Sequence, residues 1–461
     1  MLNIKKWFAK TYLDCEPKTK EEFKRSRVAF TVDGVTAGII ALVTANAYLA
    51  GYLDFLGIPP ALNGIINAVP ALTAFMQFVG AYYTQSKSKV KWMVSFFALG
   101  YRLLMSLMFV LPLFIDDQTA RIVTTFAMFL VAYILNSFIS PGASNWIASL
   151  TPQRLRGRYF SFREMINIIA CAGATIMVGF VMDYFKDQNA MQYSYYFLGG
   201  LVFLATVVNF ISLSMIKEPK IPVTGKRLPF IDMLTLPFSI KVFRPVLVFN
   251  ILWQLAFQIT YPFYGLYTIN NLGIDYKLIG IMSTFSFIWR AIVVRFWGRL
   301  ADRKSWSMVL RWTLISLICS QLINATTFRV NAMPFYIAGA IVGNIAWAGI
   351  GVATTNVLFD YAPSENRTVL IGANAAISGL FGFGISFFGG YIMNLFEKLK
   401  LKIHGLPIAP QQILMLISTV ILIFTVLYIK FVIEKNKVLK NAADGYVKPG
   451  GTPEKEELER V

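Results

Sequence analysis

Long apolar runs separated by short polar segments dominate the chain. They fall in two groups of six, at residues 28–52, 61–83, 92–114, 119–149, 159–184 and 193–216, and then at 243–270, 277–297, 307–328, 333–359, 368–396 and 411–433. Each run has the length that a tilted helix needs to cross the hydrocarbon core of a bilayer. The pattern predicts an all-α polytopic membrane protein with twelve transmembrane helices.

Composition agrees with this interpretation. Hydrophobic residues make up 56% of the 461 positions, well above the share in an average soluble chain. Most of the chain is therefore expected to lie in lipid, as one integral membrane domain rather than several soluble ones. The first 28 residues are basic and polar and the next run is long enough to span, so we expect no cleavable signal.

The position of the basic residues predicts the topology. Most of the 43 Lys and Arg residues fall in every second loop and at the two ends of the chain, which is the pattern of the positive-inside rule. Both termini are thus predicted to be cytoplasmic, in a multi-pass protein of the cell (plasma) membrane. The loop at 397–409 carries three lysines on the opposite side, against the rule. Because no basic stripe lies on a soluble domain, the net charge of +19 does not indicate a nucleic-acid partner.

These features divide the chain into five segments. They are a basic cytoplasmic N-terminus (1–27), an N-terminal six-helix bundle (28–216), a polar and Pro-bearing cytoplasmic linker (217–242), a C-terminal six-helix bundle (243–433) and a disordered cytoplasmic tail (434–461).

The two bundles share a weak internal repeat. At an offset of 211 residues, "NWIASLTPQRLRGRYF" aligns with "NVLFDYAPSENRTVLI" without a gap, so that Arg156 meets Arg367. Further along, Gly173 and Gly179 meet Gly384 and Gly390. Two parallel six-helix repeats are the expected build of a transporter whose halves rock about a substrate site at their interface.

One loop of the second half carries a more specific motif. The segment "GRLADRKS" lies between the eighth and ninth predicted spans, and it resembles the signature loop of the major facilitator superfamily. The resemblance implies that Asp302 and Arg303 latch the cytoplasmic side closed in the outward-open state, while Gly298 permits close helix approach. The equivalent first-half loop, "GAYYTQSKSK", keeps Gly80 but has Thr84 in place of the acid.

A second cytoplasmic loop, "TPQRLRGRYFSFRE", is similar to a segment of many bacterial members of that superfamily. Its Arg154, Arg156, Arg158 and Arg163 are candidates to pair with acids such as Asp302 and Glu164, in pairs that break as the bundles move. The alternative is that these arginines, with Arg367, only satisfy the positive-inside rule.

Three ionisable residues fall inside predicted spans, where charges are costly and usually functional. They are Asp33, Arg102 and Arg290. We expect Asp33 to lie about one and a half turns from the cytoplasmic end of its helix. It is either a proton-coupling carboxylate or a structural partner of Arg102 or of a cytoplasmic base.

Polar residues also follow one face of the seventh span. Asn250, Gln254, Gln258 and Tyr261 recur at spacings of three and four, and such a face must turn to a neighbouring helix or to a wet cavity. In the superfamily that the motifs resemble, spans 1, 4, 7 and 10 line the cavity. By that resemblance the candidate cavity residues extend to Asn136, Ser140, Asn344 and Trp347, each of which can instead be interhelical glue.

The sequence therefore predicts a secondary or facilitated transporter that moves a small solute by alternating access. An amide and aromatic cavity suits a sugar, nucleoside or drug-like substrate, with a proton or sodium ion as a possible coupling partner, in a monomer without cofactor or metal. Two alternatives are a receptor or sensor on a transporter scaffold and a membrane-embedded enzyme. The enzyme is disfavoured because the chain has a single His, His404, and lacks the H-E-x-x-H, G-x-S-x-G and P-loop patterns.

Overall fold

The computed structural model describes most of the chain. The residues described are 8, 11–12, 15–84, 87–150, 153–219, 229–362, 367–399, 402–403 and 406–434. The first-half helices are α2 (Lys20–Val43), α3 (Asn46–Phe55), α4 (Pro60–Asn67), α5 (Val69–Thr73), α6 (Phe75–Thr84), α7 (Lys91–Met108), η2 (Leu111–Phe114), α8 (Gln118–Ser149), α9 (Gln153–Asp187) and α10 (Met191–Met215).

A short helix, α11 (Phe230–Ser239), connects the two halves. The second half contains α12 (Arg244–Gln258), α13 (Tyr261–Leu266), η3 (Tyr267–Asn271), α14 (Tyr276–Arg303), α15 (Trp306–Ala325), η4 (Arg329–Asn331), α16 (Ala332–Tyr361), α17 (Arg367–Leu399), α18 (Pro410–Tyr428) and η5 (Ile429–Ile433). Between α17 and α18, β1 (Lys402–Ile403) and β2 (Leu406–Pro407) form a short antiparallel hairpin. His404 and the predicted tail from residue 435 onward lie outside the described residues.

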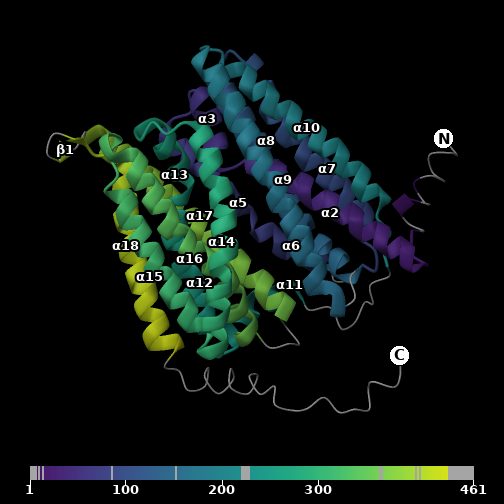
Figure 1. Ribbon diagram of the computed structural model, residues 1–461. Coiled ribbons are helices and arrows are strands. Elements are labelled where there is room, and N and C mark those ends of the chain that lie inside the picture. Colours follow the sequence, from purple (N-terminus) through teal and green to yellow (C-terminus); the bar gives the residue numbers. More distant parts are fainter. Residues whose placement is uncertain are drawn as a thin grey trace.

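The helices form two groups (Figure 1). The groups meet at the end of the molecule that carries β1, the hairpin end, and lean apart toward the end where α11 lies, the linker end. Among the described residues, eleven helical segments are long and apolar enough to cross a membrane. The segment missing from that set is α7, which carries Lys91 and Arg102 and packs between α8 and α10 as a further member of the first group. The predicted all-helical membrane fold is confirmed, and the helix count is close to the twelve expected.

The first spanning helix differs from its predicted limits at both ends. It begins at Lys20 rather than 28, because Thr19 and Glu22 form a capping box that starts the helix among charged residues. It ends at Val43, and α3 follows as a separate helix. As a result Asp33 lies roughly 20 Å from the start of α2, at its middle, and the expected position near the helix mouth is wrong.

The linker helix α11 lies against both halves. The Phe230 ring meets the rings of Phe78 and Tyr82 on α6 edge to face, with centroids 5.0 and 5.5 Å apart. Met233 of the same helix is buried with Phe78 and with Ala373 of α17. The middle of the chain is therefore packed between one helix of each half, where the sequence indicated only a polar linker.

A buried carboxylate closes the linker end of the first group. Glu218 follows α10 and accepts hydrogen bonds from the backbone N–H groups of Val90 and Lys91, the unsatisfied donors at the start of α7. The Lys91 ammonium is itself buried and donates to the carbonyl oxygen of Ser214 at 2.8 Å. Burial raises the pKa of Glu218. These contacts join α7 to the segment that leaves α10.

Glycine permits the closest helix contact in the first half at one particular position. A Cβ atom on Gly80 of α6 would lie 1.9 Å from the carbonyl oxygen of Phe138, so only glycine lets α6 approach α8 this closely. At Gly298, the motif glycine of the second half, a Cβ atom would meet nothing within 4 Å. The predicted close helix approach at Gly298 is therefore absent in this conformation and occurs at its first-half equivalent.

We expect Gly80→Ala to lower the unfolding free energy by about 1–3 kcal/mol, because the backbone of α8 must move to admit the methyl group. Gly298→Ala is the matched control, since it adds the same atom where space is open and should be neutral or stabilising by roughly 0.5–1 kcal/mol. Thermal unfolding of the two detergent-solubilised variants measures the difference. Equal melting temperatures would contradict the packing at Gly80.

Candidate functional site

The seventh spanning segment is interrupted. Helix α12 ends at Gln258 and α13 begins at Tyr261, with Pro262 in its first turn, where the missing N–H of proline does no harm. The segment then finishes as a π-helical turn, η3. A broken helix at membrane depth is tolerated only where protein or a wet cavity satisfies the freed backbone groups. The break therefore marks a candidate site.

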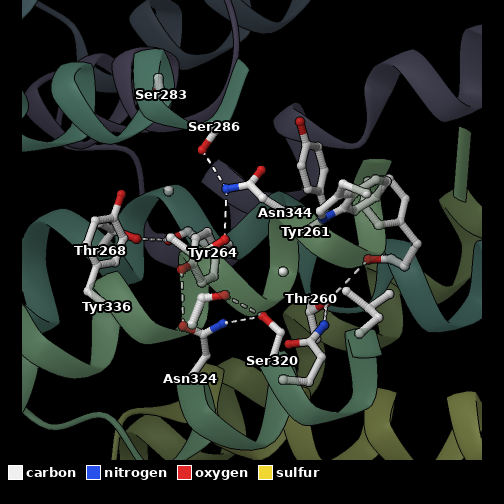
Figure 2. A pocket seen from close by; sticks show the side chains of 18 of the residues that line it. Thr260, Tyr261, Tyr264, Thr268, Ser283, Ser286, Ser320, Asn324, Tyr336 and Asn344 are labelled. Carbon is white, nitrogen blue, oxygen red and sulfur yellow. Dashed lines mark hydrogen bonds between the residues drawn. The ribbon is translucent and has the colours of Figure 1, made fainter. Parts of the chain in front are cut away.

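A cavity of about 490 Å³ lies at this break, within the size range of small-molecule sites. Its walls come from α12, α13, α14, α15, α16 and α18, with Leu42 of α2 and Ala47 of α3 reaching it from the first half. Arg290 is the one charged residue among the described residues that line it. Figure 2 shows how the polar side chains around the break point toward a common space.

One cluster of these polar groups is centred on Asn344 of α16. Its amide nitrogen donates to the Ser286 hydroxyl at 2.6 Å, as Figure 2 shows, and its amide oxygen accepts from Nε of Arg290 at 2.6 Å. Nearer the hairpin end, the Tyr264 hydroxyl donates to the Asn324 amide oxygen at 3.3 Å, and the Asn324 amide contacts Ser320. These groups give the cavity donors and acceptors on two sides.

Aromatic rings cover another wall. Trp253 and Phe257 are stacked with centroids 5.5 Å apart, and Trp347 meets both of them nearly edge on. Tyr261 continues the group, at 4.4 Å from Phe257. All four residues line the cavity, so an apolar or planar part of a solute can pack here while its polar part reaches the amides and hydroxyls.

The structure brings together some of the predicted cavity residues and separates others. Tyr261, Asn344 and Trp347 line the cavity, as does Arg290. Gln254 and Gln258 lie on a different face of α12, close to Gly382 of α17. The residues of the predicted set that lie outside the lining of this cavity are Asn136, Ser140, Asn250, Gln254 and Gln258.

Several lining residues were missed at the sequence level, namely Thr260, Tyr264, Ser286, Ser320 and Asn324. The usable signal was "TYP" at 260–262, because a proline inside an apolar run interrupts the helix and exposes the residues around the break. For Ser286 and Asn324 we find no such signal in the chain.

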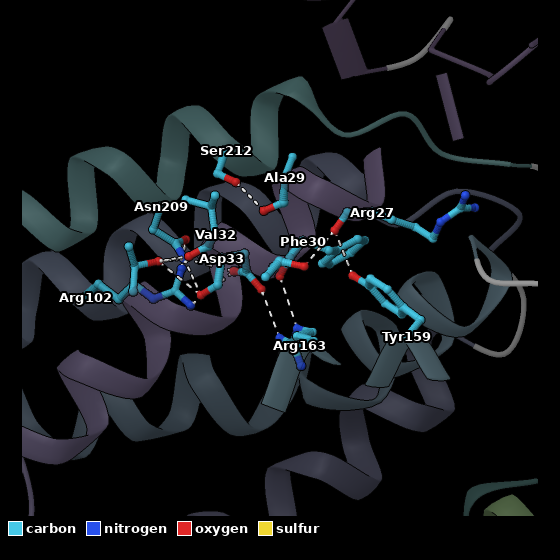
Figure 3. A network of polar contacts seen from close by, with 12 residues as sticks. Arg27, Ala29, Phe30, Val32, Asp33, Arg102, Tyr159, Arg163, Asn209 and Ser212 are labelled. Carbon is cyan, nitrogen blue, oxygen red and sulfur yellow. Dashed lines mark hydrogen bonds and ion pairs between the residues drawn. The ribbon is translucent and has the colours of Figure 1, made fainter. Parts of the chain in front are cut away.

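A second polar centre lies within the first half (Figure 3). The Asp33 carboxylate is 3.6 Å from the guanidinium of Arg102 and 3.7 Å from that of Arg163. Asn209 of α10 donates to Asp33 at 2.9 Å and also hydrogen-bonds Arg102. Two intramembrane charges that the sequence singled out are thus paired with each other, and Arg163 turns to Asp33 rather than to the acids we had expected for it.

The residues of the predicted cytoplasmic latch are only partly visible. The side chains of Arg154, Arg156, Arg158, Asp302 and Arg367 lie outside the described residues. Arg303 is exposed at the end of α14. Their roles stay predictions.

The two halves are joined at the hairpin end. The Asp183 carboxylate of α9 accepts hydrogen bonds from the backbone N–H groups of Tyr276 and Lys277 at 3.1 and 2.7 Å, at the amino terminus of α14. The favourable dipole at that terminus adds to the attraction. A Cβ atom on Gly280 would lie 2.9 Å from the carbonyl oxygen of Thr175, so α9 and α14 touch backbone to backbone. Asn270 also donates to Asp54 of the first half at 2.9 Å.

Comparison with known proteins places these features in context. The model of the Major Facilitator Superfamily matches residues 28–386. An uncharacterised MFS-type transporter of Methanocaldococcus jannaschii is 23% identical over 245 residues, which are 52% of this chain and 60% of that protein. The match therefore spans less than two thirds of the length of this relative.

Solved structures of similar fold cover nearly all of the described helices. The nucleoside transporter NupG superposes with a TM-score of 0.65 at 14% identity, over 88% of this chain and 99% of that one. A D-xylose–proton symporter superposes with a TM-score of 0.58 at 12% identity, over 88% and 96%. At these identities the likeness shows the fold alone.

We expect Asp33→Asn to lower the unfolding free energy by about 3–5 kcal/mol, because it leaves the buried Arg102 without its carboxylate. Combining it with Arg102→Gln should cost less than the sum of the two single variants, since the second change removes the unpaired charge. Thermal unfolding of the single and double variants gives this double-mutant cycle. Strictly additive effects would mean that the two residues do not depend on each other.

Proposed function

We propose that this chain, which belongs to the Major Facilitator Superfamily, is a secondary or facilitated transporter that moves a small organic solute across the membrane by alternating access. The observation that carries the proposal is the cavity at the broken seventh span, between two helix groups that are joined at one end. Its mixture of rings, hydroxyls and amides suits a solute that has both an apolar and a hydrogen-bonding part.

In this proposal the linker end faces the cytoplasm. The basic residues around α2, the α8–α9 loop and the end of α14 support that orientation. The structure then corresponds to a state in which the outer side is closed by the α9–α14 contact. Transport requires this contact to open while the halves approach each other at the linker end.

The Asp33 centre is assigned a structural role in the proposal. Its carboxylate contacts two guanidinium groups and an amide, all from helices of the first half. Such a network holds α2, α7, α9 and α10 together as one rigid body, which a rocking mechanism needs. A coupling ion, if one is used, is then expected to bind elsewhere.

The remaining alternatives are a receptor on the same scaffold and an enzyme. Among the described residues there is no group of three or more His, Cys, Asp or Glu side chains placed to hold a metal ion, and membership of a transporter family favours transport over catalysis. A receptor would bind a solute without moving it, so flux separates the two functions.

The experiment that tests transport uses the purified chain in sealed lipid vesicles. Thermal-shift screening against sugars, nucleosides, amino acids and amphipathic drugs first identifies ligands of the folded state. Counterflow of each ligand is then measured in the vesicles, with protein-free vesicles as the control. Binding without counterflow for every ligand would replace the transporter with a receptor.

The alternating-access part predicts that Asp183→Asn opens the hairpin end. Losing the charged cap of α14 costs about 1–2 kcal/mol, so the population open at that end should rise roughly 5- to 30-fold. A cysteine at Ser283, in a background without Cys15, Cys171 and Cys319, reports opening by its labelling rate with a membrane-impermeant thiol reagent.

Asp275→Asn is the control for this experiment. Asp275 pairs with Lys186 at 3.5 Å at the same end of the molecule, but both side chains are exposed and the pair contributes little. Its labelling rate should match that of the parent chain. If Asp183→Asn also labelled at the parent rate, the α9–α14 contact would not be a gate.

A further inference from the structure

Arg290 is placed where an intramembrane charge is hardest to satisfy. It lies at the middle of α14, roughly 21 Å from Tyr276, and its side chain is half-buried in the cavity wall. Lys, His, Asp and Glu are absent from the described residues that line the cavity. The cavity therefore carries one positive charge and no negative charge to offset it.

The arginine is held in place but not neutralised. Its Nε donates to the Asn344 amide oxygen, and Asn344 is fixed in turn by Ser286 and by the carbonyl oxygen of Ala340. No acidic side chain of the described residues lies within 4 Å of the guanidinium, and its two terminal nitrogens form no hydrogen bond with any of them. The guanidinium is oriented from behind while the face that binds anions is left open.

Arg102 shows what a structural arginine looks like in the same molecule. It is 5% exposed, it lies beside the Asp33 carboxylate, and Asn209 and Tyr101 accept its hydrogen bonds. Its charge is compensated within the first half. Arg290 has the amide but lacks the carboxylate, so the missing element at this otherwise similar site is an anion.

We propose that the cavity binds an organic monoanion, with the carboxylate of the solute on the terminal nitrogens of Arg290 and an aromatic or similarly flat apolar group against Trp253, Phe257 and Trp347. This inference rests on the proposed transport function and specifies its substrate class. A planar guanidinium matches a carboxylate with two parallel hydrogen bonds, and the adjacent rings provide the apolar surface. A single cation favours one negative charge over two.

The test compares solutes that differ in charge only. Naphthylacetate and indoleacetate are paired with their neutral amides, and acetate serves as the anion without a ring. Thermal shift and equilibrium binding are measured on the full chain in detergent. We expect each aromatic carboxylate to bind about 10- to 100-fold more tightly than its amide, since hydrogen bonds to charged groups contribute about 1.5–3 kcal/mol. Acetate should bind weakly because it leaves the aromatic wall empty.

Three variants connect the preference to the residue. Arg290→Gln should remove the discrimination between carboxylate and amide, while Arg290→Lys should keep part of it because the charge remains. Asn344→Asp places a carboxylate beside the guanidinium at nearly constant size and should also abolish anion binding. Arg299→Gln, an exposed arginine of the same helix outside the cavity, is the matched control.

The outcomes separate this inference from the transport proposal. Equal affinity for carboxylate and amide, no stabilisation by either carboxylate, or discrimination that survives in Arg290→Gln would overturn the inference. Counterflow of a neutral solute that ignores Arg290 would overturn the anion assignment and leave transport standing. Arg290-dependent binding without flux would support the anion site and overturn transport.

Discussion

The constraint that organises this molecule is the cost of a charge in hydrocarbon. A charged side chain within the membrane must be neutralised by the protein or by something that enters it. In the first half the protein supplies the partners, because Asp33 lies between Arg102 and Arg163 and Asn209 bridges to it. In the second half Arg290 receives an amide but no described acid. The same constraint thus makes one half rigid and makes the other receptive.

The contact between the halves follows a different physical rule. At the hairpin end the halves meet through backbone atoms, with Asp183 on the amino terminus of α14 and glycines where α9 and α14 cross. The groups that bond there are solvated at low cost when the contact opens, because they lie close to the membrane surface. A contact of this kind closes a path without making the closed state irreversible, which is what alternating access requires.

The broken seventh span connects these two features. Pro262 interrupts the helix at the depth of Arg290 and Trp347, and the residues beside the break line the cavity. The segment then continues through η3 to the loop that leads into α14, whose amino terminus Asp183 caps. One interrupted segment therefore lies beside the candidate binding site and also beside the closed end, so that a solute in the cavity can influence the contact that closes it.

Length and polarity alone were enough to predict the architecture. A run of about twenty apolar residues has one stable solution in lipid, a helix, and loop charges set its direction, so the class of fold follows from local pattern. The limits of α2 did not follow, because the capping box at Thr19 starts the helix before the apolar run does. The helical face of Gln254 and Gln258 was also correctly read as needing a protein neighbour or a cavity, but the pattern does not tell which.

That choice belonged to the tertiary structure. Spacing along a helix shows which residues share a face, whereas the neighbour of that face depends on how helices from distant parts of the chain cross. Arg102 and Arg290 look alike in sequence, as single arginines in apolar runs. Only the packed helices give one of them Asp33 and leave the other facing a cavity, because electrostatic partners in a membrane are decided by distance in space and not by distance along the chain.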